Sequence, residues 1–286
     1  MDFRFSQTFG HLQQEGYLVK SSLLSGFDHL LKANFSDDAY GHFYSAFFHL
    51  SIGIERILKL AVITSHMIEN DFKPLTDAQL KADFGHKINK LYGHTIKIAN
   101  KHSLEKYISP ESESVDFELL EFLTDFANQA RYYNLSMVST PAAKESPLAR
   151  WYGLAMRVLE DEYSFSKMCK DANKLFYEPE QNMMAGYTYE RDFEGHPMTY
   201  YDVTLRFRRT AKSAPYMVWR LIKLLKPVYE AHHDISMTAH EIEAAHQQDQ
   251  KSRPRLPTIP YMYEFFPFLL ATRADSIRRK RWLPLF

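Results

Sequence analysis

The most regular pattern in the sequence is a run of large apolar residues between positions 37 and 70. They recur at steps of three and four residues: Phe43, Phe47, Leu50, Ile54, Ile57, Leu58 and Ala61. Such steps place side chains on one face of an α-helix, and a face this apolar must be buried against other helices. The spacing therefore predicts a long helix packed inside a helical bundle.

Four further segments of residues 1–176 have helical patterns. We expect helices at 12–33, from Thr76 to about residue 102, at 115–135, and from Ser146-Pro147 to about residue 174. Thr76 and Ser146 are suited to cap the helices that follow them, and Pro147 to occupy a first helical turn. Long helices joined by short polar loops are typical of a bundle. We therefore predict a mainly α fold with a bundle in residues 1–176.

The pattern changes after residue 177. Segments 186–193 and 198–208 are rich in tyrosine and β-branched residues and flank the turn sequence Glu194-Gly195-His196-Pro197. Apolar and polar residues alternate over 203–208, which is typical of a strand and favours a β-hairpin. Helical patterns return at 214–232 and 238–250, the second with Thr238 and Glu241 spaced as a capping box. We predict a smaller α+β extension in residues 177–286, packed on the bundle.

Composition excludes several classes of protein. The chain has 35 basic and 35 acidic side chains and one cysteine, Cys169. These numbers argue against a general polyanion binder, a disulfide framework and a cysteine-rich zinc site, and they fit a reducing cytosol. The N-terminus lacks the layout of a signal peptide, and the apolar run at 259–271 is interrupted by proline and too short to cross a bilayer. We expect a cytoplasmic protein without a membrane partner.

No cofactor or metal site is predicted. The sequence contains no P-loop, dinucleotide fingerprint, nucleophile elbow or paired cysteine motif. Histidines gather at positions 232, 233, 240 and 246. Zinc-binding histidines on one helix face usually stand three or four residues apart, whereas the steps here are seven and six. We therefore predict neither a metal centre nor a metal hydrolase.

Polar residues interrupt the apolar helix faces at a few positions. Glu55 and Lys59 are spaced to pair along one helix, with Arg56 beside them, and the simplest interpretation is a solvated stripe. Arg131 follows small residues on a face of 115–135, and a buried charge needs a partner. We expect Glu55 to pair with Arg131. An alternative is that Arg131, Tyr132 and Asn134 line a pocket beside His86.

Three segments occur in an order that suggests a family: FHLSIGIERILKL (48–60), GHKINKLY (85–92) and FANQARYYNLSM (126–137). This order resembles the HEPN superfamily of prokaryotic helical bundles over about the first half of the chain. The resemblance implies a dimer that acts on RNA without a metal, in toxin–antitoxin, abortive-infection or phage-defence systems. It also implies an antitoxin or another defence-system partner. Other members of the superfamily have lost the nuclease motif and serve as binding or structural domains.

The nuclease motif of that family is an arginine, four to six residues and a histidine near the start of a late helix. The window after Arg131 is YYNLSMV and has no histidine. Arg4 with His11, and Arg191 with His196, fit the spacing, but about two such matches arise by chance in a chain of this composition. His86 and Arg131 could instead meet across two helices, as general base and phosphate-binding group. The more common role for His86 is a hydrogen bond to a backbone or carboxylate group.

Two further features bear on partners. Arg206, Arg208 and Arg209, with the basic run 278–281, could form an RNA-binding surface, and the alternative is a solvated strand face. The apolar and aromatic tail at 261–286 predicts self-association, because large exposed apolar patches usually mark interfaces. The leading hypothesis is a HEPN-like protein that binds or cleaves RNA as a homodimer. The alternative is a catalytically inactive helical module for dimerisation or for binding a small ligand.

Overall fold

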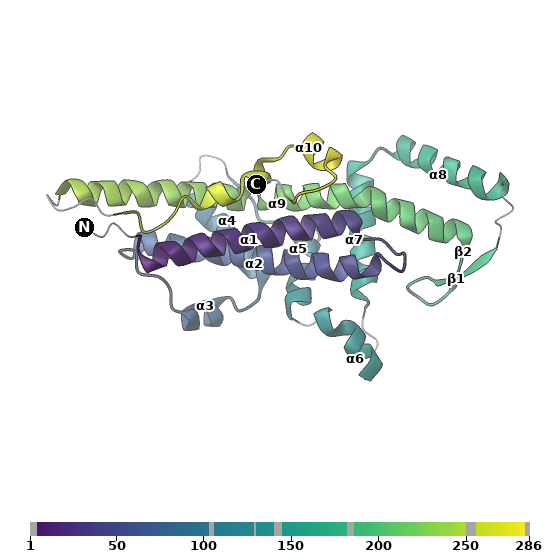
Figure 1. Ribbon diagram of the computed structural model, residues 1–286, viewed down its shortest axis with the longest axis horizontal. Helices are drawn as coiled ribbons and strands as arrows, with labels where there is room; N and C mark the ends of the chain where they lie inside the picture. Colours follow the sequence, from purple (N-terminus) through teal and green to yellow (C-terminus); the bar gives the residue numbers. More distant parts are fainter. Residues whose placement is uncertain are drawn as a thin grey trace.

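The computed structural model describes residues 5–102, 106–128, 130–139, 145–181, 186–249 and 256–283. This part of the chain is mainly α-helical and carries a two-stranded antiparallel hairpin (Figure 1), so the predicted fold class is confirmed. The helices are α1 (Gln7–Lys32), α2 (Tyr40–Glu69), α3 (Asp77–Asp83), α4 (Ile88–His102), α5 (Val115–Asn128), α6 (Tyr133–Ser139), α7 (Pro147–Glu162), α8 (Phe165–Gln181), α9 (Tyr200–Asp249) and α10 (Arg273–Arg278). The strands are β1 (Tyr187–Arg191) and β2 (Pro197–Thr199), and the 3-10 turns are η1 (Ala130–Tyr132), η2 (Met262–Phe265) and η3 (Pro267–Leu270).

One apolar core holds the molecule together. Helices α1, α2 and α9 run along the long axis in Figure 1, and α4, α5 and α7 pack against them. The predicted apolar face of α2 is buried, from Phe43 to Ala61, at 0–1% exposure. Side chains of α9, such as Val218 and Leu225, belong to the same cluster as those of α2. Of the helices in the described part of the chain, none combines the length and the apolar character needed to span a bilayer.

Helices α1 and α2 approach each other closely through two reciprocal glycine–leucine contacts. A Cβ atom added to Gly26 on α1 would lie 2.7 Å from Leu50 Cγ on α2, and one added to Gly53 on α2 would lie 2.8 Å from Leu23 Cδ2 on α1. Each leucine therefore fills the space that a side chain would take on the facing helix. The two glycines set the distance between the helices, because neither has a Cβ.

The second half of the chain differs from its prediction. A single 50-residue helix, α9, replaces the expected strand at 198–208 and the two expected helices. Its length is about 75 Å at 1.5 Å per residue, and it continues through Pro215 and Pro227. Thr238 and Glu241 lie inside it and cap nothing. Figure 1 shows α9 crossing almost the whole molecule.

The strand prediction failed because two periods overlap in this segment. Alternation at 203, 205 and 207 suggested a strand, but of these only Val203 is buried, and the next buried positions are Arg206, Thr210, Ser213, Ala214 and Met217. These follow steps of three and four, which are helical. Thr199 and Asp202 form a reciprocal cap in which Thr199 N donates to Asp202 and Asp202 N donates to Thr199 Oγ1. This cap starts the helix immediately after β2.

Three helices predicted as continuous are divided. The helix expected from Thr76 ends at Asp83, after the expected capping box with Gln79, and α4 begins only at Ile88. The helix expected at 115–135 ends at Asn128, and the helix from Pro147 ends at Glu162 before α8. The first break is set by Gly85, whose φ of +55° lies in the left-handed region that favours glycine.

The C-terminal segment packs onto α1. Residues Met262, Phe266 and Trp282 are fully buried, and Phe27 of α1 contacts the Trp282 ring edge-to-face at 5.3 Å. The buried Asp28 carboxylate accepts hydrogen bonds from the backbone N–H groups of Trp282 and Leu283. Part of the apolar tail that suggested self-association is therefore used within the chain, whereas Tyr261, Leu270 and Leu283 remain 38–51% exposed.

Candidate functional site

A group of charged side chains lies where α2 meets the turn between α3 and α4. Glu55 on α2 has a mostly buried side chain, 13% exposed. Its Oε1 atom accepts a hydrogen bond from Lys59 Nζ at 2.6 Å and lies 3.0 Å from His86 Nδ1. The Glu55–Lys59 pair confirms the prediction from their spacing. The carboxylate thus holds the histidine while the ammonium group balances its charge.

His86 reaches Glu55 because the backbone turns at Gly85. The left-handed conformation of Gly85 ends α3, and its N–H group donates to Leu80 O. His86 therefore lies in a turn. The sequence analysis had placed it within a helix, and that prediction was wrong. Its side chain is 64% exposed. With Nδ1 directed to a carboxylate, Nε2 remains available to a ligand, which is the arrangement that fixes the tautomer of a working histidine.

A small cavity of about 170 Å³ adjoins this pair. It brings His86 and Arg131, which are far apart in sequence, to one place. Its lining consists of Phe48, Ser51, Ile52, Glu55, His86, Phe126, Ala127, Asn128 and Arg131. The cavity therefore has a carboxylate-bound imidazole, a guanidinium group and an otherwise mostly apolar wall.

The expected ion pair between Glu55 and Arg131 does not form in the described structure. Glu55 is engaged by Lys59 and His86, and Arg131 is exposed, with its guanidinium carbon 4.9 Å from the centre of the Tyr132 ring. The reason is the break after Asn128, which places Arg131 in η1 at the cavity edge. Arg131 is thus free of a carboxylate in the described part of the chain and can meet an anion.

The remaining predicted residues of this region point elsewhere. Arg56 Nη1 pairs with Glu15 Oε2 on α1 at 2.5 Å. Asn134 Oδ1 accepts a hydrogen bond from Tyr44 Oη at 3.3 Å. Of the three residues expected beside His86, Arg131 lines the cavity, whereas Tyr132 and Asn134 are absent from its wall.

A second, larger cavity of about 690 Å³ shares His86 and Asn128 with the first. It extends along α5 toward α6 and α7. The other lining residues are Gly85, Lys87, Phe122, Asp125, Ala130, Tyr133, Ser136, Glu145, Pro147 and Arg150. Arg150 is paired with Asp125 at 2.5 Å. Sequence reasoning missed this cavity, because its wall comes from four separate segments whose spacing carries no common signal.

The pair Arg191 and His196 occupies the hairpin turn. Arg191 Nη1 donates to Gly195 O at 2.7 Å, and His196 Nδ1 lies 3.1 Å from Asp192 Oδ2. The pKa of the Asp192 carboxyl is lowered, chiefly because the carboxylate accepts a hydrogen bond from the backbone N–H group of His196. Asp192, Glu194 and His196 offer ligand atoms within 4.8 Å of one another. These contacts stabilise the hairpin turn, and they give Arg191 and His196 a structural role there. Arg4, of the other spacing match, lies outside the described residues.

Arg206 and Arg208 lie on α9 and not on a strand, and they do not share a face. Arg206 is 5% exposed, donates to Glu190 Oε2 and Arg191 O at 3.1 Å each, and lies over the Phe35 ring. It fastens the hairpin to the bundle and is not available to RNA. Arg208 is exposed. Two residues along a helix turn the side chain by about 200°, whereas two along a strand restore its direction.

Comparisons of the chain with known protein families, with curated proteins and with solved structures give no match. The two cavities that share His86 and Asn128 are therefore the best-supported candidate site in the described part of the chain.

Proposed function

We propose that this chain is a HEPN-like protein that binds RNA at the Glu55–His86–Arg131 cavity and cleaves it without a metal ion. The observation that carries the proposal is the hydrogen bond between His86 Nδ1 and the Glu55 carboxylate, beside a cavity that Arg131 also lines. A carboxylate that orients an imidazole is the usual way to prepare a general base.

The chemistry follows from the two nitrogen atoms of His86. With Nδ1 held by Glu55, Nε2 takes the proton of a ribose 2′-hydroxyl. The 2′-oxygen then attacks the adjacent phosphorus, the bond to the 5′-oxygen breaks, and that oxygen takes a proton from water. The products are a 2′,3′-cyclic phosphate and a 5′-hydroxyl, and His86 returns its proton to solvent. General base catalysis of this kind supplies about 10²–10⁴-fold in rate.

Arg131 and the larger cavity would hold the RNA. The Arg131 guanidinium, which lines the smaller cavity, would bind the phosphate whose charge develops during attack. A nucleotide next to the scissile phosphate would fit the 690 Å³ cavity, whose wall includes the Tyr133 ring. Base stacking on an aromatic ring is worth about 1–3 kcal/mol. We expect single-stranded RNA to bind better than duplex RNA, because its bases are free to stack.

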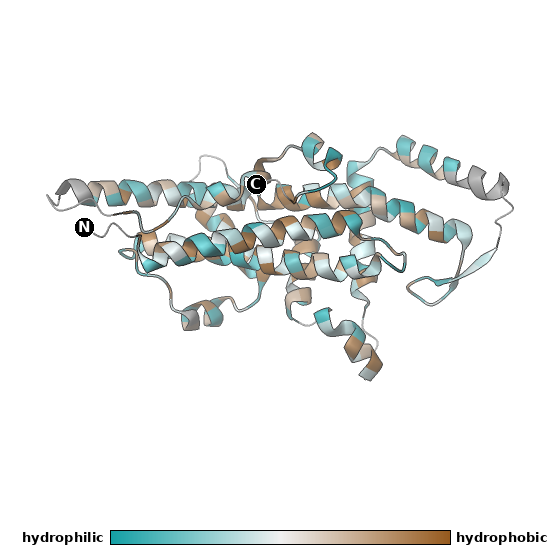
Figure 2. Ribbon diagram, viewed as in Figure 1, coloured by the Kyte–Doolittle hydropathy of each residue, from teal (hydrophilic) through white to brown (hydrophobic). Residues whose placement is uncertain are grey.

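A second function is favoured by one observation. Leu135 and Val138 on α6 are 68% and 85% exposed, and Figure 2 shows α6 at the edge of the molecule, hydrophilic where it begins and more hydrophobic toward its end. Two apolar side chains on a peripheral helix suit a contact with a second copy of the chain or with a defence-system partner such as an antitoxin. A dimer formed through α6 without RNA cleavage is the function of an inactive helical module.

The test uses purified protein, fluorescent single-stranded RNA and EDTA. We expect cleavage that His86→Gln reduces by about 10²–10⁴-fold and that Arg131→Met reduces by about 10²-fold or more. His196→Gln is the matched control, because His196 is also an exposed histidine held through Nδ1 by a carboxylate, and it should cut normally.

Two results would contradict the proposal. Loss of cleavage in His196→Gln with normal cleavage in His86→Gln would move the active site to the hairpin. An unmutated chain that dimerises, cleaves no RNA and binds none would favour the inactive module. Thermal melts of each variant would separate loss of activity from loss of fold.

A further inference from the structure

The ammonium group of Lys59 and the imidazole of His86 contact the same oxygen atom of Glu55. Lys59 Nζ donates to Glu55 Oε1 at 2.6 Å, and His86 Nδ1 lies 3.0 Å from that oxygen and 3.2 Å from Oε2. Because both nitrogen atoms contact Oε1, they are at most about 5.6 Å apart. A cation this close to an imidazole disfavours a second positive charge on the ring.

Lys59 holds the Glu55 carboxylate from within its own helix. The two residues are one turn apart on α2, and their side chains are only 24% and 13% exposed. Arg56, the cation next to Glu55 in the sequence, pairs with Glu15 on α1 instead. A group supported by a packed helix keeps its place more precisely than one on a loop. The carboxylate is thus fixed by Lys59 on one side and receives His86, from the turn after α3, on the other.

Other charged groups line the two cavities around His86, and they come from the same turn, from η1, from α5 and from the start of α7. They are Lys87, Arg131, Asp125, Glu145 and Arg150. Asp125 and Arg150 pair with each other at 2.5 Å. Glu55 is the carboxylate in hydrogen-bond contact with His86, and Lys59 is the cation joined to that same carboxylate oxygen. Lys59 is therefore the charge whose removal should act most directly on the Glu55–His86 pair.

We propose that Lys59 is a positioning residue for the RNA cleavage: it holds the Glu55 carboxylate in place and opposes protonation of His86, so that Nε2 can accept the proton of the 2′-hydroxyl. This inference rests on the function proposed above. A carboxylate alone favours the protonated imidazole, which cannot act as a base. Lys59 offsets that effect while it leaves Glu55 ionised, as an acceptor for the Nδ1–H group.

The first measurement needs no RNA. The histidine ring signals of the full chain are followed by NMR as the pH is changed, and the His86 signal is assigned by its loss in His86→Gln. Lys59→Gln should raise the midpoint of the His86 titration by about 0.5–1 pH unit, as expected when a unit charge at this distance is removed near the surface. Lys59→Arg keeps the charge and should keep the midpoint. Lys59→Met is a second variant without the charge, in case Lys59→Gln does not fold.

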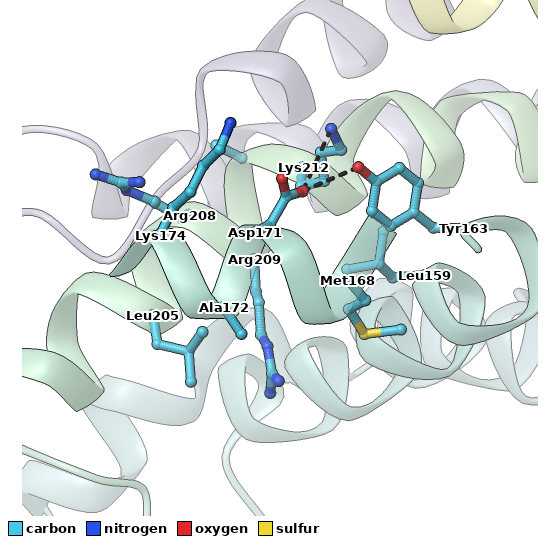
Figure 3. A pocket seen from close by; sticks show the side chains of 11 residues that line it. Leu159, Tyr163, Met168, Asp171, Ala172, Lys174, Leu205, Arg208, Arg209 and Lys212 are labelled. Carbon is cyan, nitrogen blue, oxygen red and sulfur yellow. Dashed lines mark hydrogen bonds and ion pairs between the residues drawn. The ribbon is translucent and has the colours of Figure 1, made fainter. Parts of the chain in front are cut away.

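Lys212 supplies the matched control. Its Nζ atom lies 3.9 Å from Asp171 Oδ2 and over the Tyr163 ring, where α8 packs on α9 (Figure 3). The cavity of about 390 Å³ that these residues line shares no residue with the two cavities around His86. Lys212→Gln therefore removes the same charge from a lysine–carboxylate contact elsewhere in the molecule. It should leave both the His86 midpoint and the cleavage of RNA unchanged.

The second measurement is the rate of RNA cleavage as a function of pH. On the acidic side of the profile, Lys59→Gln should lower the rate by about three- to tenfold, because a smaller fraction of His86 is then in its basic form. At higher pH, where His86 is unprotonated in either chain, the rates should agree within about twofold. Lys59→Arg should restore the acidic side of the profile. A merely structural role of Lys59 would instead lower the rate equally at every pH.

The two measurements separate this inference from the proposed function. An unchanged His86 midpoint in folded Lys59→Gln and Lys59→Met would overturn the inference, whether or not the chain cleaves RNA. So would a rate that falls equally at every pH. A raised midpoint in a chain that cleaves no RNA would support the action of Lys59 on His86 and refute the cleavage itself.

Discussion

The close contact between α1 and α2 predicts that Gly26→Ala destabilises the protein, although helix propensity alone predicts that it stabilises. In a helix interior, replacing glycine with alanine normally stabilises by about 1 kcal/mol. At Gly26 the new Cβ would lie 2.7 Å from Leu50 Cγ and 3.3 Å from Leu50 N. Leu50 is fully buried, so a change of its rotamer would drive Cγ and Cδ2 into other core side chains. The third near atom belongs to the backbone, and we therefore expect the helices to separate.

The size of the effect is measured against a matched variant. Gly153 lies inside α7 and would have nothing within 4 Å of an added Cβ. Gly153→Ala should stabilise by about 1 kcal/mol. Overpacking a core costs about 1–3 kcal/mol, so Gly26→Ala should be about 1–3 kcal/mol less stable than Gly153→Ala. Chemical denaturation of both variants, with equal m-values, gives this difference directly.

A double-mutant cycle then identifies the cause. Leu50→Ala alone should cost about 2–5 kcal/mol, and it should cost less in the Gly26→Ala background, because the added methyl group takes part of the vacated space. A coupling of about 0.5–3 kcal/mol is typical of residues in contact. If Gly26→Ala stabilises the protein as much as Gly153→Ala does, the helices are not held apart by this contact, and the reasoning is wrong.

Two other predictions concern buried groups. Burial lowers the pKa of His232 to about 4, while its Nε2 atom contacts Ile57 O. The unfolded chain therefore binds a proton between about pH 4 and 6.5 that the folded chain does not, so stability should decrease as the pH is lowered from about 6.5 to 4, by up to about 3 kcal/mol. Urea melts of His232→Gln should show a flatter dependence, and an unchanged slope would mean that His232 does not titrate in this way. Removing the buried Arg206 guanidinium, as in Arg206→Met, should cost about 1.5–3 kcal/mol and release amide protection over 187–191 in hydrogen exchange. Glu190→Gln keeps the hydrogen-bonding shape and should have the smaller effect, and equal protection in Arg206→Met would show that another contact holds the hairpin.

The parts of the fold that depend on local pattern were predictable. The face of α2 follows from its own spacing, and the capping box at Thr76 follows from two residues three positions apart. The start of α9 was not found, although Thr199 and Asp202 carry an equally local capping signal, because the alternation at 203–207 fits a strand as well as a helix. Its passage through Pro215 and Pro227 has no local signal, since tertiary packing of Val218 and its neighbours supports it.

The candidate site was predictable only in its members. Glu55, His86 and Arg131 were singled out because each interrupts a pattern, and all three line one cavity. The pairing of Glu55 with His86 instead of Arg131 was not predictable, because it depends on where two helices end. The left-handed Gly85 turns His86 toward Glu55, and the break after Asn128 leaves Arg131 at the cavity edge.

The bond from the Asp28 carboxylate to the backbone of Trp282 spans 254 positions along the chain. A ribosome that adds about 5–20 residues per second needs roughly 10–50 s to travel from one residue to the other. For most of that time α1 lies outside the ribosome, while Phe27 lacks the Trp282 ring and Asp28 lacks its two hydrogen-bond donors. A chain without the segment around Trp282 thus exposes the apolar face of α1 around Phe27, which is buried once that segment packs onto it. Chaperones that recognise exposed apolar surface have a direct means of telling nascent copies of this protein from completed ones.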